Sequence, residues 1–100
     1  MWDGIMVEFR NDDLGYLAWT SANPDGFVLN VRRKADPKYV VLHRAACGSI
    51  SNGNQARGAF TGRSYRKICA ASVAELQFAA KREGRNDGSY SKRCGLCQPC

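Results

Sequence analysis

Four residues in two short motifs have the side-chain types and the spacing of a metal site. His43 and Cys47 form an H-x3-C motif, and Cys94 and Cys97 form a C-x2-C motif around Gly95. Imidazole nitrogens and thiolate sulfurs are the ligands that zinc takes in tetrahedral sites, and four protein ligands leave no open position for an activated water. We therefore predict a structural zinc ion bound by His43, Cys47, Cys94 and Cys97.

Two further cysteines provide alternative ligands. Cys100 extends the terminal motif to C-x2-C-x2-C and could replace His43 or another ligand. Cys69 lies in an apolar segment, which is typical of a buried small side chain. A site made of Cys47, Cys69, Cys94 and Cys97 is nevertheless chemically as acceptable as the first set.

The cysteine count indicates a reducing compartment. The chain has five cysteines and shows no signal-peptide pattern at its N-terminus, so a disulfide framework is not expected. No run of residues approaches the roughly 18 apolar residues of a membrane span. We expect a cytoplasmic, nucleoid-associated protein that does not contact a membrane.

Charge is distributed unevenly along the chain. Residues 1–26 have a net charge of −4 and residues 27–100 a net charge of +10, which gives +6 for the whole chain. A basic segment of this kind favours a polyanionic partner. Together with the metal motif, this charge predicts binding to DNA, and to duplex DNA rather than to a single strand.

The hydrophobic pattern predicts a single α+β domain over residues 1–100. We expect a small antiparallel sheet with strands over 5–9, 16–20, 27–31, 38–42 and 64–70, and one main helix over 72–83. Asn23-Pro24-Asp25-Gly26 is typical of a hairpin turn, and Ser72 with Glu75 is typical of a capping box, with Gly84 as the stop. Residues 1–42 are mainly β in this interpretation, and residues 43–100 form the zinc- and DNA-binding region.

The two motifs resemble those of a known family. His43-Arg44-x-x-Cys47, followed by a basic stretch and by Lys92-Arg93-Cys94-x-x-Cys97-Gln98-Pro99, is similar to the zinc-binding domain of Ada-type DNA-repair proteins, which is also appended to bacterial nucleases. The resemblance covers about the last 58 residues and implies zinc, DNA and a nuclease or other DNA-processing protein as a partner. In the repair enzymes a cysteine accepts a methyl group where this chain has His43, so that activity is expected to be absent.

A second resemblance concerns modified DNA. The segment Asn23–Asn30, which runs toward the strand that contains His43 and Arg44, resembles bacterial modules that accompany modification-dependent nucleases. This resemblance implies a reader of modified DNA, with 5-methylcytosine as the first candidate.

The expected DNA contacts are basic and aromatic side chains. Trp19 and Tyr65 are candidates for stacking on an extruded base, and the loop over 52–63 is a candidate for entering a groove. We expect contacts with DNA from eleven residues, which are Arg32, Arg33, Lys34, Arg44, Arg57, Arg63, Tyr65, Arg66, Lys67, Lys92 and Arg93.

No catalytic set is visible in the sequence. The only histidine is already assigned to the metal, which leaves no imidazole to activate a nucleophile. A methyl-transfer or redox enzyme would need a reactive cysteine with a depressed pKa. We therefore predict a non-enzymatic DNA-binding protein that reads 5-methylcytosine. The alternative is a zinc-stabilised protein-interaction or regulatory module that does not bind DNA.

Overall fold

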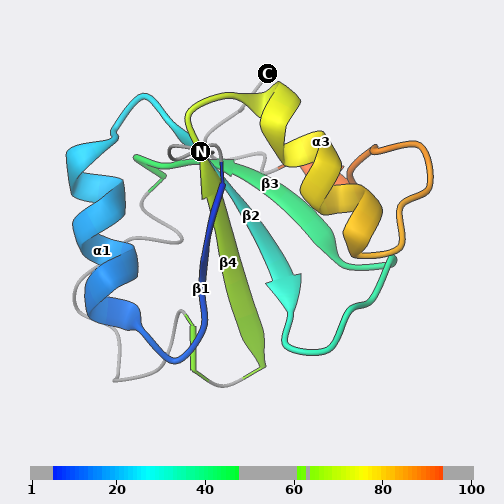
Figure 1. Ribbon diagram of the computed structural model, residues 1–100, viewed down its shortest axis with the longest axis horizontal. Coiled ribbons are helices and arrows are strands. Elements are labelled where there is room, and N and C mark those ends of the chain that lie inside the picture. Colours follow the sequence, from blue (N-terminus) through cyan, green and yellow to red (C-terminus); the bar gives the residue numbers. More distant parts are fainter. Residues whose placement is uncertain (1–5, 48–60, 63, 94–100) are drawn as a thin grey trace.

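One mixed sheet lies between two helices. The computed structural model describes residues 6–47, 61–62 and 64–93. Its elements along the chain are β1 (Val7–Phe9), α1 (Asp13–Ala22), β2 (Phe27–Arg32), β3 (Val40–Arg44), β4 (Tyr65–Ala70), α3 (Val73–Arg82) and β5 (Lys92–Arg93). The strand order is β1-β4-β2-β3-β5, and α1 and α3 lie on opposite sides of the strands (Figure 1). The α+β fold class is therefore confirmed.

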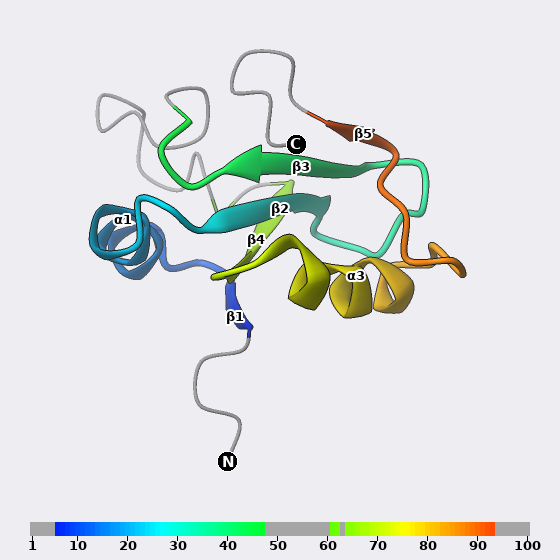
Figure 2. The ribbon, with the colours of Figure 1, turned by 90° about the horizontal axis from the view of Figure 1, so that it is seen from above.

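The three long strands form the antiparallel centre of the sheet. β2 pairs with β4 on one side and with β3 on the other, so Leu29 lies opposite both Ile68 and Leu42. The strands predicted over 27–31, 38–42 and 64–70 are therefore confirmed. Each carries a run of β-branched or large apolar residues, which favour strands. The two short edge strands differ in direction, since β1 is antiparallel to β4 whereas β5 is parallel to β3 (Figure 2).

Alternation along the strands divides the core between the two helices. Leu29, Leu42 and Ile68 face α3 and pack against residues that include Leu76 and Ala80. Val28 and Cys69 are the sequence neighbours of Leu29 and Ile68. They pack on the other face of the sheet with Tyr16 of α1. Each face of the sheet thus has its own apolar cluster, because successive side chains of a strand point to opposite faces.

The predicted strand over 16–20 is wrong, because these residues lie in α1. Asp12 caps this helix, with its carboxylate accepting from the Gly15 backbone N–H at 2.9 Å. The Asp13 carboxylate at the first turn accepts from the Thr61 backbone N–H at 2.8 Å and from its hydroxyl at 2.6 Å. Tyr16 and Thr20, one helical turn apart, are the buried residues of the helix. The capping and the helical spacing therefore outweigh the β-propensity of Tyr, Trp and Thr.

The turn over 23–26 exists, but it does not join two strands. The backbone N–H of Asn23 and its side-chain amide both donate to the Trp19 carbonyl, each at 2.9 Å, and so end α1. Gly26 then donates to the Asn23 carbonyl at 2.9 Å and leads into β2. The predicted hairpin is thus a helix-to-strand connection.

The one predicted helix, over 72–83, is confirmed as α3 (Val73–Arg82). Gly84 has φ +105°, a left-handed conformation that favours glycine, and it follows the last turn as expected. The capping box differs in detail, because the Ser72 hydroxyl donates to the Glu75 carboxylate at 2.8 Å and makes no hydrogen bond to the backbone.

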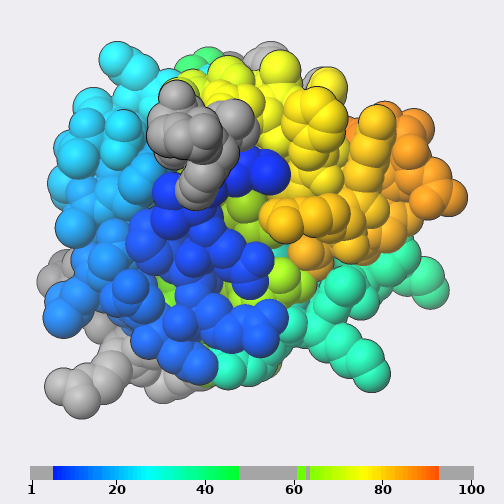
Figure 3. Space-filling view, in the orientation of Figure 1, coloured from blue at the N-terminus to red at the C-terminus, as the bar shows by residue number. Residues whose placement is uncertain are grey.

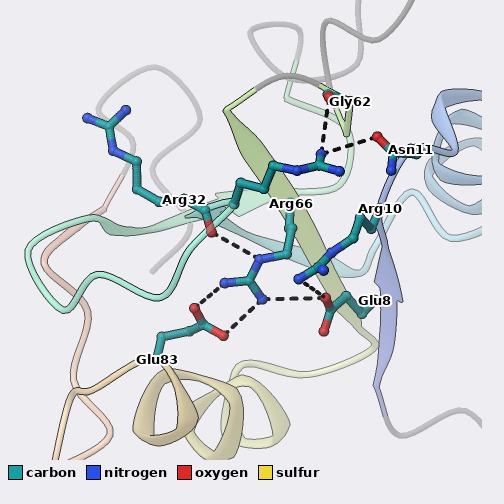
Figure 4. A network of polar contacts seen from close by, with 8 residues as sticks. Glu8, Arg10, Asn11, Arg32, Gly62, Arg66 and Glu83 are labelled. Carbon is teal, nitrogen blue, oxygen red and sulfur yellow. Dashed lines mark hydrogen bonds and ion pairs between the residues drawn. The ribbon is translucent and has the colours of Figure 1, made fainter.

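A buried ion pair joins the end of α3 to the sheet. Both guanidinium Nη atoms of Arg66 on β4 contact the Glu83 carboxylate, one of them at 3.1 Å. Each of the two residues is only 5% exposed. Arg66 Nη1 also lies 3.4 Å from the Glu8 carboxylate of β1. One side chain therefore links β1, β4 and the C-terminal end of α3 (Figure 4).

We expect Glu83→Gln to lower the free energy of unfolding by about 3 kcal/mol, because removal of one charge leaves the other buried and incompletely paired. Urea denaturation monitored by circular dichroism measures the loss. Glu75→Gln is the matched control, since Glu75 lies on the first turn of α3 and, among the described residues, accepts a side-chain hydrogen bond only from the Ser72 hydroxyl. Equal effects of the two variants would contradict the structural role of the pair.

Candidate nucleic-acid interface

Arg32 lies against two tyrosine rings at the end of β2. Its guanidinium carbon is 4.6 Å from the ring centroid of Tyr39 and 5.3 Å from that of Tyr65. The two ring centroids are 5.5 Å apart, with the ring planes inclined by 43°. Arg32 Nη1 also lies 3.4 Å from the Tyr65 hydroxyl. We call these three residues, Arg32, Tyr39 and Tyr65, the arginine–tyrosine cluster.

Strand register brings the cluster together from distant parts of the chain. Arg32 on β2 lies opposite Tyr65 on β4. Tyr39 directly precedes β3, whose Val40 pairs with Val31. Arg32 and Tyr65 were predicted from the sequence, whereas Tyr39 was not, because nothing local in the sequence shows which residue the neighbouring strand places beside Arg32.

Asn30 and Lys67 form the inner layer behind the cluster. Lys67 Nζ donates to the Asn30 side-chain oxygen at 3.0 Å, and the Asn30 amide donates to the Tyr39 hydroxyl at 3.3 Å. Lys67 Nζ is also 5.6 Å from the Tyr65 ring centroid. The pair thus supports both rings. Asn30 was not predicted as a site residue. It lies on the same face of β2 as Arg32, which comes two residues later in the strand.

Lys67 is a correction to the predicted surface contacts. It is 3% exposed, and this burial lowers its pKa to about 8, against the opposing effects of Asp13 and Cys69. The Lys67 ammonium group is therefore buried in the interior of the protein and does not point toward a bound phosphate.

Arg66 is a second correction. Its guanidinium is buried against Glu83 and Glu8, and its Nε donates to the Arg32 carbonyl at 3.0 Å. The expected phosphate contact is excluded by this burial, yet the residue still affects the site. Arg66 fixes the backbone from which the Arg32 side chain extends away from the ion pair (Figure 4).

The remaining predicted cations have different surroundings. Arg33 donates to the Asn11 side chain and to the Gly62 carbonyl, each at 3.1 Å. Lys34, which follows it, is exposed. The exposed side chains of Arg44 and Lys92 lie elsewhere on the sheet, at the end of β3 and in β5. Arg93 pairs with Leu42 through its backbone, and Arg57 and Arg63 lie outside the described residues.

Trp19 does not share a pocket with Tyr65. Trp19 lies on α1 and packs with the Tyr16 cluster, and its ring approaches Gly26 at the start of β2. Tyr65 lies opposite Arg32 at the other end of that strand. Six residues of extended strand span about 20 Å, so the two rings cannot enclose one base.

Two of the predicted metal ligands are described, and both are buried. His43 is 7% exposed, and its Nδ1 has no hydrogen-bond partner in the described part of the chain. Burial, with further contributions from Lys67 and Lys92, lowers its pKa to about 4, so the imidazole is neutral near pH 7. Cys47 follows β3 in a turn, where its N–H donates to the Arg44 carbonyl at 3.0 Å.

Of the other predicted metal ligands, only Cys69 is among the described residues. Cys94, Cys97 and Cys100 are not among the described residues. Over residues 6–47, 61–62 and 64–93, no group of three or more His, Cys, Asp or Glu side chains could hold a metal ion. Cys69 is fully buried beside Tyr16 and Val28, and this burial raises the pKa of its thiol.

Comparisons of the chain with protein-family models, with curated proteins and with solved structures found no match. Within the described ranges, no helix is long and apolar enough to cross a membrane. The function is therefore inferred from the residues of the interface themselves.

We expect the Cys69 thiol to react with iodoacetamide only when the protein unfolds, because thiolates react and burial keeps this thiol protonated. Peptide mass mapping after brief alkylation, with and without urea, measures the reaction at this one residue. Fast modification of Cys69 in the folded protein would contradict its place in the core, and would favour an enzyme with a reactive cysteine.

Proposed function

We propose that this chain is a non-enzymatic protein that binds duplex DNA through the arginine–tyrosine cluster and the basic residues that follow it. The proposal rests on one observation, the surroundings of the Arg32 guanidinium. Its guanidinium has no carboxylate partner among the described residues, and two aromatic rings hold it in place. A cation that the protein has oriented but not neutralised is suited to an anionic or hydrogen-bond-accepting ligand.

The surroundings of the cluster favour a polyanion. Arg33 and Lys34 come directly after Arg32, and the exposed Lys38 directly precedes Tyr39. The segment that carries these residues, between β2 and β3, projects at the rim of the molecule (Figure 3). Several cations on one projecting segment can displace the counterions of adjacent phosphates, which gives affinity that falls with salt.

A preference for 5-methylcytosine is part of the proposal. The methyl group of this base lies in the major groove, where apolar side-chain surface can contact it as it contacts the methyl group of thymine. The rings of Tyr39 and Tyr65, beside Arg32, supply such surface. The cluster thus combines a hydrogen-bond donor for a base edge with apolar surface for a methyl group.

We also propose a structural zinc ion held by His43 and Cys47 with Cys94 and Cys97. A buried neutral imidazole with an unpartnered Nδ1 is costly unless a further group pairs with it, and a zinc ion would do so. β5 runs parallel to β3 so that Arg93 pairs with Leu42. In the sequence, His43 follows Leu42 and Cys94 follows Arg93. The ion would join the end of β3 to the C-terminal motif.

DNA binding is tested by fluorescence anisotropy with two duplexes of one sequence, one of them carrying 5-methylcytosine, at several salt concentrations. We expect tighter binding to the methylated duplex and a steep salt dependence. Arg32→Ala should weaken binding about tenfold, as expected for loss of a specific arginine contact.

Lys81→Ala is the matched control, because Lys81 is an exposed cation on α3, on the opposite side of the sheet from α1. It should change the affinity less than about twofold. Absence of binding to either duplex would overturn the proposal and favour the protein-interaction module.

Zinc is tested by native mass spectrometry of protein purified under reducing conditions. We expect one zinc ion per chain, lost in His43→Ala and retained in Cys69→Ala, since Cys69 belongs to the core cluster. A folded wild-type protein without metal would contradict the proposal, and loss of zinc in Cys69→Ala would favour the alternative ligand set.

A further inference from the structure

The Arg32 side chain is held more firmly than phosphate binding requires. A phosphate attracts any nearby cation, and a lysine on a flexible stem can also bind one as a point charge. Arg32 instead lies against the Tyr39 and Tyr65 rings, at 4.6 and 5.3 Å from their centroids. Cation–π contact with both rings limits the directions in which the N–H groups of the planar guanidinium can point.

The backbone of Arg32 is also held from the opposite face of the sheet. Its carbonyl accepts a 3.0 Å hydrogen bond from Arg66 Nε, and the buried contact with Glu83 orients Arg66 in turn. Arg32 also lies in register with Tyr65 on the neighbouring strand. The Arg32 side chain thus extends from a backbone position that these two contacts fix.

Arg32 keeps most of its hydrogen-bonding capacity. A guanidinium has five N–H donors, and the one hydrogen bond that the Arg32 guanidinium makes to a described residue is the long 3.4 Å contact with the Tyr65 hydroxyl. Arg33, Arg66 and Arg85 differ, since each donates at least one shorter hydrogen bond to a protein oxygen, at 2.5–3.1 Å. Arg32 combines fixed orientation with free donors.

An oriented guanidinium with free donors matches one base edge in particular. Guanine presents the N7 and O6 acceptors side by side in the major groove, and a bidentate arginine contact to this pair is the commonest specific contact to DNA. Arg33 and Lys34 continue the chain beyond Arg32 and would lie near the adjacent backbone phosphates.

We propose that Arg32 is the specificity residue of the interface and reads the N7 and O6 atoms of a guanine, while the residues that follow it bind phosphates. This inference rests on the proposed DNA binding. It assigns the guanine contact to one side chain, Arg32, and assigns to Tyr39 and Tyr65 the task of orienting it.

The test uses the full chain and a duplex that contains every dinucleotide step, prepared with guanine or with 7-deazaguanine. The analogue keeps the base pair and the phosphate charges but lacks the N7 acceptor. We expect the wild-type protein to bind the 7-deazaguanine duplex about tenfold more weakly, which is the discrimination of one good bidentate contact.

Two conservative variants separate charge from geometry. Arg32→Lys keeps the charge and loses the planar donor pair, so it should discriminate between the two duplexes less than the wild-type protein and keep the wild-type salt dependence. Arg82→Lys is the matched control, since Arg82 is an exposed arginine on α3, on the opposite side of the sheet from Arg32. It should keep the tenfold discrimination.

The outcomes distinguish the inference from the function on which it rests. If the wild-type protein binds both duplexes equally while Arg32→Ala still weakens binding, Arg32 contacts a phosphate and the inference is wrong although DNA binding stands. If Arg32→Ala binds both duplexes as the wild-type protein does, the cluster is not the interface and the proposed function fails with the inference.

Discussion

The buried contact between Arg66 and Glu83 is the interaction on which the rest of the structure depends. Two charges that are each 5% exposed lose most of their hydration, and this cost is offset only when the charges are paired and hydrogen-bonded. Arg66 meets this condition with Glu83, with Glu8 and with the Arg32 carbonyl. The end of α3, the edge strand β1 and the end of β2 are therefore held relative to one another by one side chain.

This arrangement separates two roles that the sequence places side by side. Arg66 and Lys67 are neighbours on β4, and they point to opposite faces of the sheet because strand side chains alternate. Arg66 secures the α3 face, whereas Lys67 pairs with Asn30 behind Tyr39 and Tyr65 on the other face. The adjacent cations consequently form the support of a site, and Arg32, further along the face of Lys67, keeps free donors.

The elements with consistent local signals could be predicted from the sequence. β2, β3, β4 and α3 contain long apolar runs or a helical pattern that ends at Gly84, and no competing signal contradicts them. α1 could not be predicted by residue type, since Tyr16, Trp19 and Thr20 are typical of strands. Its decisive feature is the capping by Asp12 and the bonds between Asp13 and Thr61, and the latter join residues 48 positions apart. Tyr39, Asn30 and the partner of Arg66 were missed for the same reason, because only the strand register and the packing of α3 reveal them.

The central claim is that Arg32, oriented by Tyr39 and Tyr65, meets DNA while Arg66 remains buried with Glu83. NMR of the arginine Nε–Hε groups during titration with a methylated duplex tests this claim most directly. The account predicts that the Arg32 resonance shifts and broadens as DNA is added, whereas the Arg66 resonance keeps its position. A shift of Arg66 with Arg32 unchanged, or no change in either resonance on addition of saturating DNA, would contradict it.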